Sequence, residues 1–190
     1  EYSVEVGYGS TAQGSYSTSI GGHAIGKNSI AIGRDSNPAS AGGDNSIAIG
    51  GHTNSTNDIA IGAGSSTSGG QAIAVGGSAT GGQAVSIGGV AGSFQATAVG
   101  SGSAATGSQS TAVGGHAGNV YSTAVGQGAN ATYVYTTAVG NNSTASGDHS
   151  TALGYGTSAQ GSNTTAIGGA NANGTNLTVI GNNSTASASD

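Results

Sequence analysis

A four-residue pattern that ends in glycine, such as Ile30-Ala31-Ile32-Gly33, constrains the fold of this chain more than any other feature. Versions of it recur fourteen times in 190 residues, and successive terminal glycines lie 12 to 17 residues apart. Those glycines are Gly7, Gly21, Gly33, Gly50, Gly62, Gly76, Gly88, Gly100, Gly114, Gly126, Gly140, Gly154, Gly168 and Gly181. A short repeat that fills a chain is typical of a solenoid, in which one unit stacks on copies of itself. The sequence therefore predicts an all-β solenoid of about fourteen coils, each of 12 to 17 residues.

The residues before each terminal glycine form columns of like side chains. The residues one and three positions before it are branched, and they share one face of a short strand. The residue between them is mostly Ala, and a second Ala column lies nine positions before the glycine. We expect the branched residues to pack inward against the second strand and the first Ala column to face outward. Glycines seven positions before, such as Gly14 and Gly107, predict a turn with positive φ.

The column five positions before the glycine contains runs of like residues. Three Asn residues, Asn28 to Asn57, are followed by four Gln residues, Gln71 to Gln109, and then by Tyr121 and Tyr135. Coils that stack at about 4.8 Å would let these amides form hydrogen-bonded ladders and let the tyrosines stack. Because the runs survive the changes in coil length, we expect the extra residues to lie in loops.

Composition excludes several function classes. Two basic and seven acidic residues give a net charge of −5, which argues against nucleic-acid binding and against attraction to an anionic membrane. The chain has no Cys, no apolar stretch long enough to span a membrane, and no spacing of Ser, His and acid that suggests a triad. We therefore expect no enzyme activity, no cofactor and no metal site.

Two groups of residues are candidates for surface binding. The longest interval between glycines contains Arg34, Asp35 and Asp44, and it predicts a loop from Arg34 to Asp44 that is either a binding loop or a tolerated insertion. The densest aromatic group is Tyr121, Tyr133 and Tyr135, which are interaction residues or a structural ladder.

Three histidines share one position in the repeat. His23, His52 and His116 each follow a Gly-Gly pair, but they belong to coils too far apart to converge on one ion within a chain. We interpret them as exposed turn residues; the alternative is a ring of one His from each subunit around a symmetry axis.

The segments Asn28 to Gly33, Asn45 to Gly50, Ser110 to Gly114 and Ser122 to Gly126 closely resemble the head repeats of YadA-like trimeric autotransporter adhesins. The resemblance covers residues 1–190 as a single head repeat domain. It implies a left-handed parallel β-roll, a homotrimeric head, and display on the outer membrane of a Gram-negative bacterium as a virulence-type adhesin. The neck, stalk and anchor of that family have no counterpart here, so we expect the sequence to be a piece of a longer chain.

The resemblance also indicates partners. It implies attachment to extracellular matrix proteins, host cells, abiotic surfaces or other adhesin heads. We expect no membrane contact by this segment, since it has neither an apolar span nor clustered basic residues. The number of subunits, three, comes from the resemblance. We expect the subunits to meet through Ala98, Ala112, Ala124 and Ala138, since small side chains permit close approach of sheets.

Two other functions are compatible with a repetitive solenoid. An ice-binding β-solenoid would use regular Thr columns, but we expect the Thr residues three before the glycine to share the inward face of Val and Ile. A left-handed β-helix acyltransferase would need hexapeptides in coils of about 18 residues, and these spacings differ.

Overall fold

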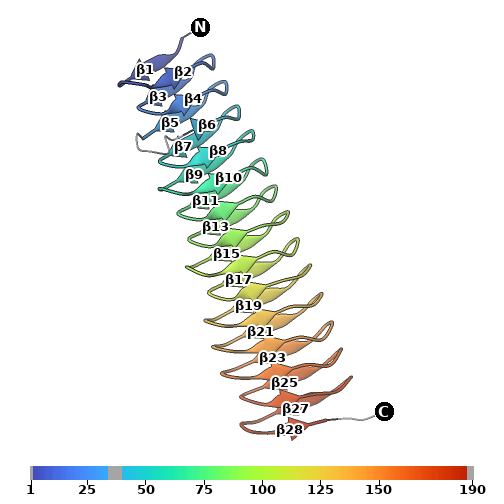
Figure 1. Cartoon of the computed structure of the whole chain (residues 1–190). Helices are drawn as coiled ribbons and strands as arrows, with labels where there is room; N and C mark the ends of the chain where they lie inside the picture. Colours follow the sequence, from blue (N-terminus) through green and yellow to red (C-terminus); the bar gives the residue numbers. More distant parts are fainter. Residues whose placement is uncertain (1, 34–39, 188–190) are drawn as a thin grey trace. The chain divides into compact units, whose positions relative to one another are not determined.

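The computed structural model describes residues 2–33 and 40–187, and the chain forms two compact units, Glu1–Gln95 (unit 1) and Ala96–Asp190 (unit 2). The described residues form short strands and turns and no helix, and the architecture is a parallel β-solenoid (Figure 1). Each coil contributes one strand of three residues and one of two residues. The predicted all-β repeat architecture is therefore confirmed.

The strands of unit 1 alternate between these two kinds. They are β1 (Val4–Val6), β2 (Thr11–Ala12), β3 (Thr18–Ile20), β4 (His23–Ala24), β5 (Ile30–Ile32), β6 (Ser40–Ala41), β7 (Ile47–Ile49), β8 (His52–Thr53), β9 (Ile59–Ile61), β10 (Ser66–Thr67), β11 (Ile73–Val75), β12 (Ser78–Ala79), β13 (Val85–Ile87) and β14 (Val90–Ala91).

Unit 2 continues the same alternation. Its strands are β15 (Thr97–Val99), β16 (Ala104–Ala105), β17 (Thr111–Val113), β18 (His116–Ala117), β19 (Thr123–Val125), β20 (Asn130–Ala131), β21 (Thr137–Val139), β22 (Thr144–Ala145), β23 (Thr151–Leu153), β24 (Ser158–Ala159), β25 (Thr165–Ile167), β26 (Asn171–Ala172), β27 (Thr178–Ile180) and β28 (Thr185–Ala186).

Within each unit the odd-numbered strands form one parallel sheet and the even-numbered strands form another, in chain order. Register pairs equivalent residues of successive coils, as in Thr111 with Thr123 and Ala112 with Ala124. The columns read from the sequence are thus columns in space.

Differences in coil length lie in one turn only. The turn from an even strand to the next odd strand always has five residues, whereas the turn that begins at the terminal glycine has two to four where all its residues are described. A variable turn at one edge leaves both sheets in register, as the sequence predicted. We call the edge with the constant five-residue turns the constant edge, and the other the variable edge.

The core consists of Ala and small polar residues, and the predicted assignment of faces is wrong. Ala98, Ala112, Ala124 and Ala138 are 0% exposed within the single chain, as is Ala105 of the facing sheet. They lie between the two sheets and are not available to contact another subunit. In a coil this short the sheets lie close together, and the space between them is filled by Ala, Ser and Thr, such as Thr53 and Thr67, with Val179 as the largest apolar member.

The branched columns face outward. In the odd strands the two outer residues are partly or fully exposed, whereas the middle residue is buried in all but β1. Ile87 is 47% exposed and Val113 is 38% exposed. Each unit therefore carries an uncovered apolar sheet face, which we call the branched face.

The two glycine columns have different physical causes. All fourteen terminal glycines have positive φ, from 64° at Gly76 to 132° at Gly33. Gly107, seven positions before a terminal glycine, does not, so the expected positive φ there is wrong. A Cβ at Gly107 would lie 2.0 Å from the carbonyl oxygen of Asn119, so this column is small because successive turns stack backbone on backbone.

Buried hydroxyl groups close the constant-edge turns. The hydroxyls of Ser29 and Ser46 each donate a 2.6 Å hydrogen bond to the carbonyl oxygen three residues earlier, at Gly26 and Gly43. Such bonds satisfy polar atoms that would otherwise be buried without partners. They explain why the residue four before the terminal glycine is so often Ser or Thr.

Candidate functional site

The column five positions before the terminal glycine lies on the constant edge, and all of its members from Tyr16 onward have a left-handed backbone, with φ between 54° and 61°. Asn tolerates this conformation, but Gln, Tyr and His do so at a cost of about 1 to 2 kcal/mol each. The turn geometry therefore projects a single ladder of long side chains from this edge in each unit.

The amide ladders predicted from the sequence are present. The side-chain nitrogen of Asn28 donates to the oxygen of Asn45 at 3.0 Å, and that of Gln83 donates to Gln71 at 3.1 Å. Gln95 donates to Gln83 at 2.8 Å in the same way. Each bond links neighbouring coils at the surface.

Unit 2 carries an aromatic ladder. The rings of Tyr121 and Tyr135 stack with centroids 4.9 Å apart and planes 8° apart. His149 extends the stack, 4.9 Å from Tyr135, and was not among the predicted site residues although the same column contains it. Tyr133 lies two residues before Tyr135 in the same turn and is 50% exposed. The sequence-predicted tyrosines thus gather on one edge, and we call these four residues the aromatic patch.

The predicted loop from Arg34 to Asp44 is not one segment. Arg34 and Asp35 lie outside the described residues. Strand β6 follows, and Asp44 belongs to the constant edge, where its carboxylate accepts a 2.8 Å hydrogen bond from the backbone nitrogen of Lys27. The expected loop boundary is therefore wrong, because the regular coil resumes at Ser40.

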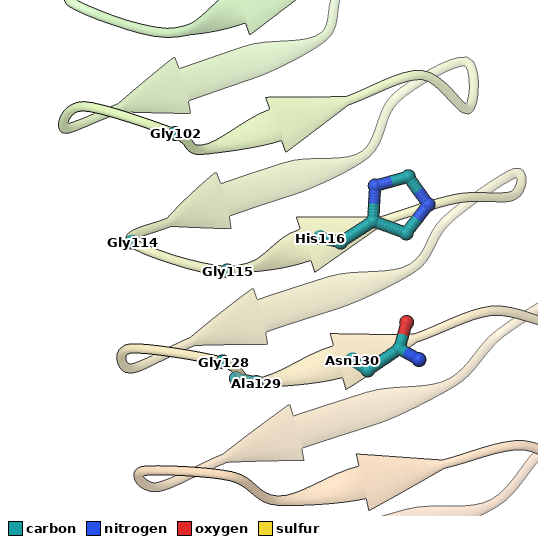
Figure 2. A pocket seen from close by; sticks show the side chains of 7 residues that line it. All are labelled: Gly102, Gly114, Gly115, His116, Gly128, Ala129 and Asn130. Atoms are coloured by element: carbon teal, nitrogen blue, oxygen red, sulfur yellow. The ribbon is translucent and has the colours of Figure 1, made fainter.

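One shallow hollow opens on the variable edge of unit 2. The two-residue turn at Gly114 and Gly115 lies between two four-residue turns, and the shorter turn leaves a recess. Figure 2 shows His116 and Asn130 projecting beside it from neighbouring strands. Within the described structure the Asn130 side-chain oxygen is buried without a hydrogen-bond partner.

The histidines lie at the first position of even strands. His23, His52 and His116 begin β4, β8 and β18. Among residues 2–33 and 40–187, no three His, Cys, Asp or Glu side chains are grouped closely enough to hold a metal ion. The ring of histidines from three subunits stays an untested alternative.

The outward Thr column changes one argument about function. Thr111, Thr123 and Thr137 lie in register on the branched face, not in the core. The expectation that they share the inward face is wrong, so it gives no reason against ice binding.

Two parallel sheets, short glycine-terminated strands, an Ala interior and ladders along one edge define a β-solenoid repeat protein, in which only two basic and seven acidic residues occur. A family model of the YadA head domain repeat matches residues 6–24, 24–53, 54–79, 91–117, 117–143, 134–157 and 145–171. These segments cover most of the chain, so it belongs to the YadA head repeat family, whose members are adhesin repeats of surface-exposed autotransporters. Among curated proteins, none matches the chain closely enough to serve as a relative.

The family match weighs against both other functions. YadA head repeats are neither ice-binding proteins nor acyltransferases, and the resemblance predicted from the sequence is confirmed. In the described part of the chain, no helix is long and apolar enough to cross a membrane.

Proposed function

We propose that this chain is the head segment of a trimeric autotransporter adhesin on the outer membrane of a Gram-negative bacterium, and that it attaches the cell to host matrix, host cells or other surfaces. The observation that carries the proposal is the branched face, which is apolar, regular and uncovered in a single chain. Parallel sheets are normally covered on both faces. Family membership supplies three as the number of subunits.

Subunits of this trimer meet through the branched face, not through the Ala columns. Val, Ile or Leu side chains project from it at every coil, and Val99, Val113 and Val125 form one such row in unit 2. Burying them against two further subunits removes apolar area from water at about 25 cal/mol per Å². The trimer would then have a second apolar core, between its subunits, in addition to the thin Ala core inside each chain.

Adhesion uses the surfaces that the trimer leaves open. The aromatic patch on the constant edge of unit 2 is our leading contact site, because Tyr side chains bury much area at low entropic cost. We place Arg34, Asp35 and Asp44 among further surface candidates. Single contacts are weak, since the surface is shallow and nearly uncharged, and many trimers on one cell hold it by avidity.

The test compares particles coated with the natural chain and with a Tyr121→Ser, Tyr133→Ser, Tyr135→Ser variant. Both are measured for attachment to surfaces coated with collagen, fibronectin or laminin, after light scattering has established that the trimer persists. The variant is expected to lose most of the attachment. Tyr155→Ser is the control, because Tyr155 is 77% exposed but lies on the variable edge.

Two outcomes would contradict the proposal. Full attachment by the triple variant would move the contact site to the Ser-, Thr- and Asn-rich surface. A natural chain that attaches to none of the surfaces would act as a spacer and not as an adhesin.

A further inference from the structure

The constant edge of unit 1 has a hollow where two coils lack a side chain. The column six positions before the terminal glycine holds Thr56 and Phe94, and between them the glycines Gly70 and Gly82 on successive coils. The hollow is lined by these residues and by the amides of Gln71 and Gln83, and we call it the glycine notch.

Packing does not account for Gly70, although it restricts Gly82, where a Cβ would lie 3.0 Å from the carbonyl oxygen of Gly69. A Cβ at Gly69 or Gly81, one position earlier, would lie 2.1 Å or 1.9 Å from a backbone oxygen, so those glycines are required by the stacking of turns. A Cβ at Gly70 would meet nothing nearer than the carbonyl oxygen of Thr56, at 3.9 Å. The space in front of Gly70 is therefore open.

The turn that contains Gly70 differs from its neighbours in backbone conformation and in hydrogen bonding. Gly70 has φ of 76°, a value that no other residue of its column shares in the described structure. Ala72 and Ala84 occupy the same position in successive turns. The Ala84 nitrogen donates to the Gly81 carbonyl within its own turn, whereas the Ala72 nitrogen donates at 2.9 Å to the carboxylate of Asp58. Asp58 is 0% exposed. A buried carboxylate thus holds this turn in a conformation unlike that of its neighbours.

The walls of the notch present polar and aromatic groups without charge. Gln83 donates one N–H to Gln71 and accepts one from Gln95, so its amide retains a second N–H and a second oxygen lone pair. Neighbouring amides repeat at the coil spacing of about 4.8 Å. At one end Phe94 is 51% exposed, and its Cδ2 would lie 3.4 Å from a Cβ at Gly82.

We propose that the glycine notch binds a neutral pyranose sugar of a glycan. The apolar C–H face of the sugar packs on the Phe94 ring, and its hydroxyls exchange hydrogen bonds with the Gln71 and Gln83 amides. Hydroxyls on alternate carbons of a hexose are separated by a distance similar to the coil spacing. The lining has no charged side chain, which favours neutral sugars over sialylated or sulfated ones.

The test uses the whole 190-residue chain and saturation-transfer NMR with methyl glycosides of glucose, galactose and N-acetylglucosamine. Sialyllactose and a neutral peptide of similar mass are the comparison probes. Phe94→Ser removes the ring and gives the residue found at Ser15 and Ser162 of the same column. Gly70→Asn fills the notch, because Asn tolerates positive φ and the added atoms meet open space.

At least one neutral glycoside is expected to bind the natural chain, and each variant is expected to weaken that binding about fivefold. Ser162→Asn adds the same amide to the same column in unit 2 and leaves binding unchanged. Circular dichroism establishes that every variant is folded. Binding that survives both variants, binding of the peptide or sialyllactose alone, or binding of no probe overturns the proposal. None of these outcomes depends on cell attachment or on the trimer.

Discussion

Glycine at the end of each repeat and glycine seven positions earlier look alike in sequence but are required for different physical reasons. The first adopts positive φ at the variable edge, and the second allows neighbouring turns to stack. The residue five before the terminal glycine is the opposite case, since Tyr and Gln occupy a left-handed conformation that glycine would adopt at lower cost. Stacking and amide bonds between coils offset that cost where like side chains meet, as between Tyr121 and Tyr135 and between Gln71 and Gln83.

The terminal glycines give a prediction at the residue scale. A Cβ at Gly126 would lie 2.7 Å from the Gly140 carbonyl, and φ there is 125°, so Gly126→Ala combines backbone strain with a clash. We expect it to cost more than about 2 kcal/mol of stability. Gly102→Ala has positive φ but no atom within 4 Å of the added Cβ, and it should cost about 1 kcal/mol.

Thermal unfolding followed by circular dichroism measures both variants. The Gly126→Ala chain should melt at a clearly lower temperature than the Gly102→Ala chain. Equal losses would mean that φ alone selects glycine and that the approach of Gly140 is unimportant.

At the scale of the strand, alternation decides which residues share a face but not which face is inside. Strand β17 reads Thr111-Ala112-Val113, and any such strand places the two outer residues together. The large apolar residues face outward here because the facing strand β18 lies too close to admit them. This is the reverse of the arrangement expected when branched residues are assumed to fill the core.

Adjacent positions in β17 test this assignment. Ala112→Glu places a charge between the sheets, where Ala112 is 0% exposed, and should remove the strand signal in circular dichroism and make the chain protease-sensitive. Val113→Glu lies on the branched face and should leave the single chain folded while light scattering shows loss of the proposed trimer. A folded Ala112→Glu chain would mean that Ala112 does not lie between the sheets. A trimer that tolerates Val113→Glu would mean that the subunits do not meet through the branched face.

At the scale of the whole molecule, charge and surface chemistry limit how the protein holds its target. The chain has a net charge of −5, so three chains carry −15. The branched face also differs between the units, because its residues three before the glycine are Ile or Val from β5 to β13 of unit 1 and Thr throughout unit 2. A proposed trimer interface is accordingly more apolar along unit 1 than along unit 2.

Salt dependence is the prediction that belongs to this scale. Attachment that rests on apolar and hydrogen-bonding contacts should change little between about 0.05 M and 0.5 M salt, since only attraction between exposed charges is screened. Attachment of coated particles over this range measures it. Detachment at moderate salt would point to an attractive charged contact, which the aromatic patch does not offer.

The sequence by itself determined the period, the register and the ladders. Each depends on like residues recurring at equivalent positions, and stacking turns such a recurrence directly into contact, as for Tyr121 and Tyr135. It also placed the length variation in loops and led to the family that the comparison bears out. The aromatic patch followed for the same reason, apart from His149.

Only the tertiary structure decided which face of the odd strands is buried, where Asp44 lies, and that two glycines of unit 1 leave an open notch. These depend on the distance between the two sheets and on which turn absorbs an insertion, and neither is encoded in the spacing of residues along one strand. The separation of the sheets follows from the closure of a coil of 12 to 14 residues in three dimensions, which buries small residues such as Ala112 and Ala105 and leaves Val113 on the outer face, 38% exposed. The order of the side chains along the strand is the same whichever face is turned inward.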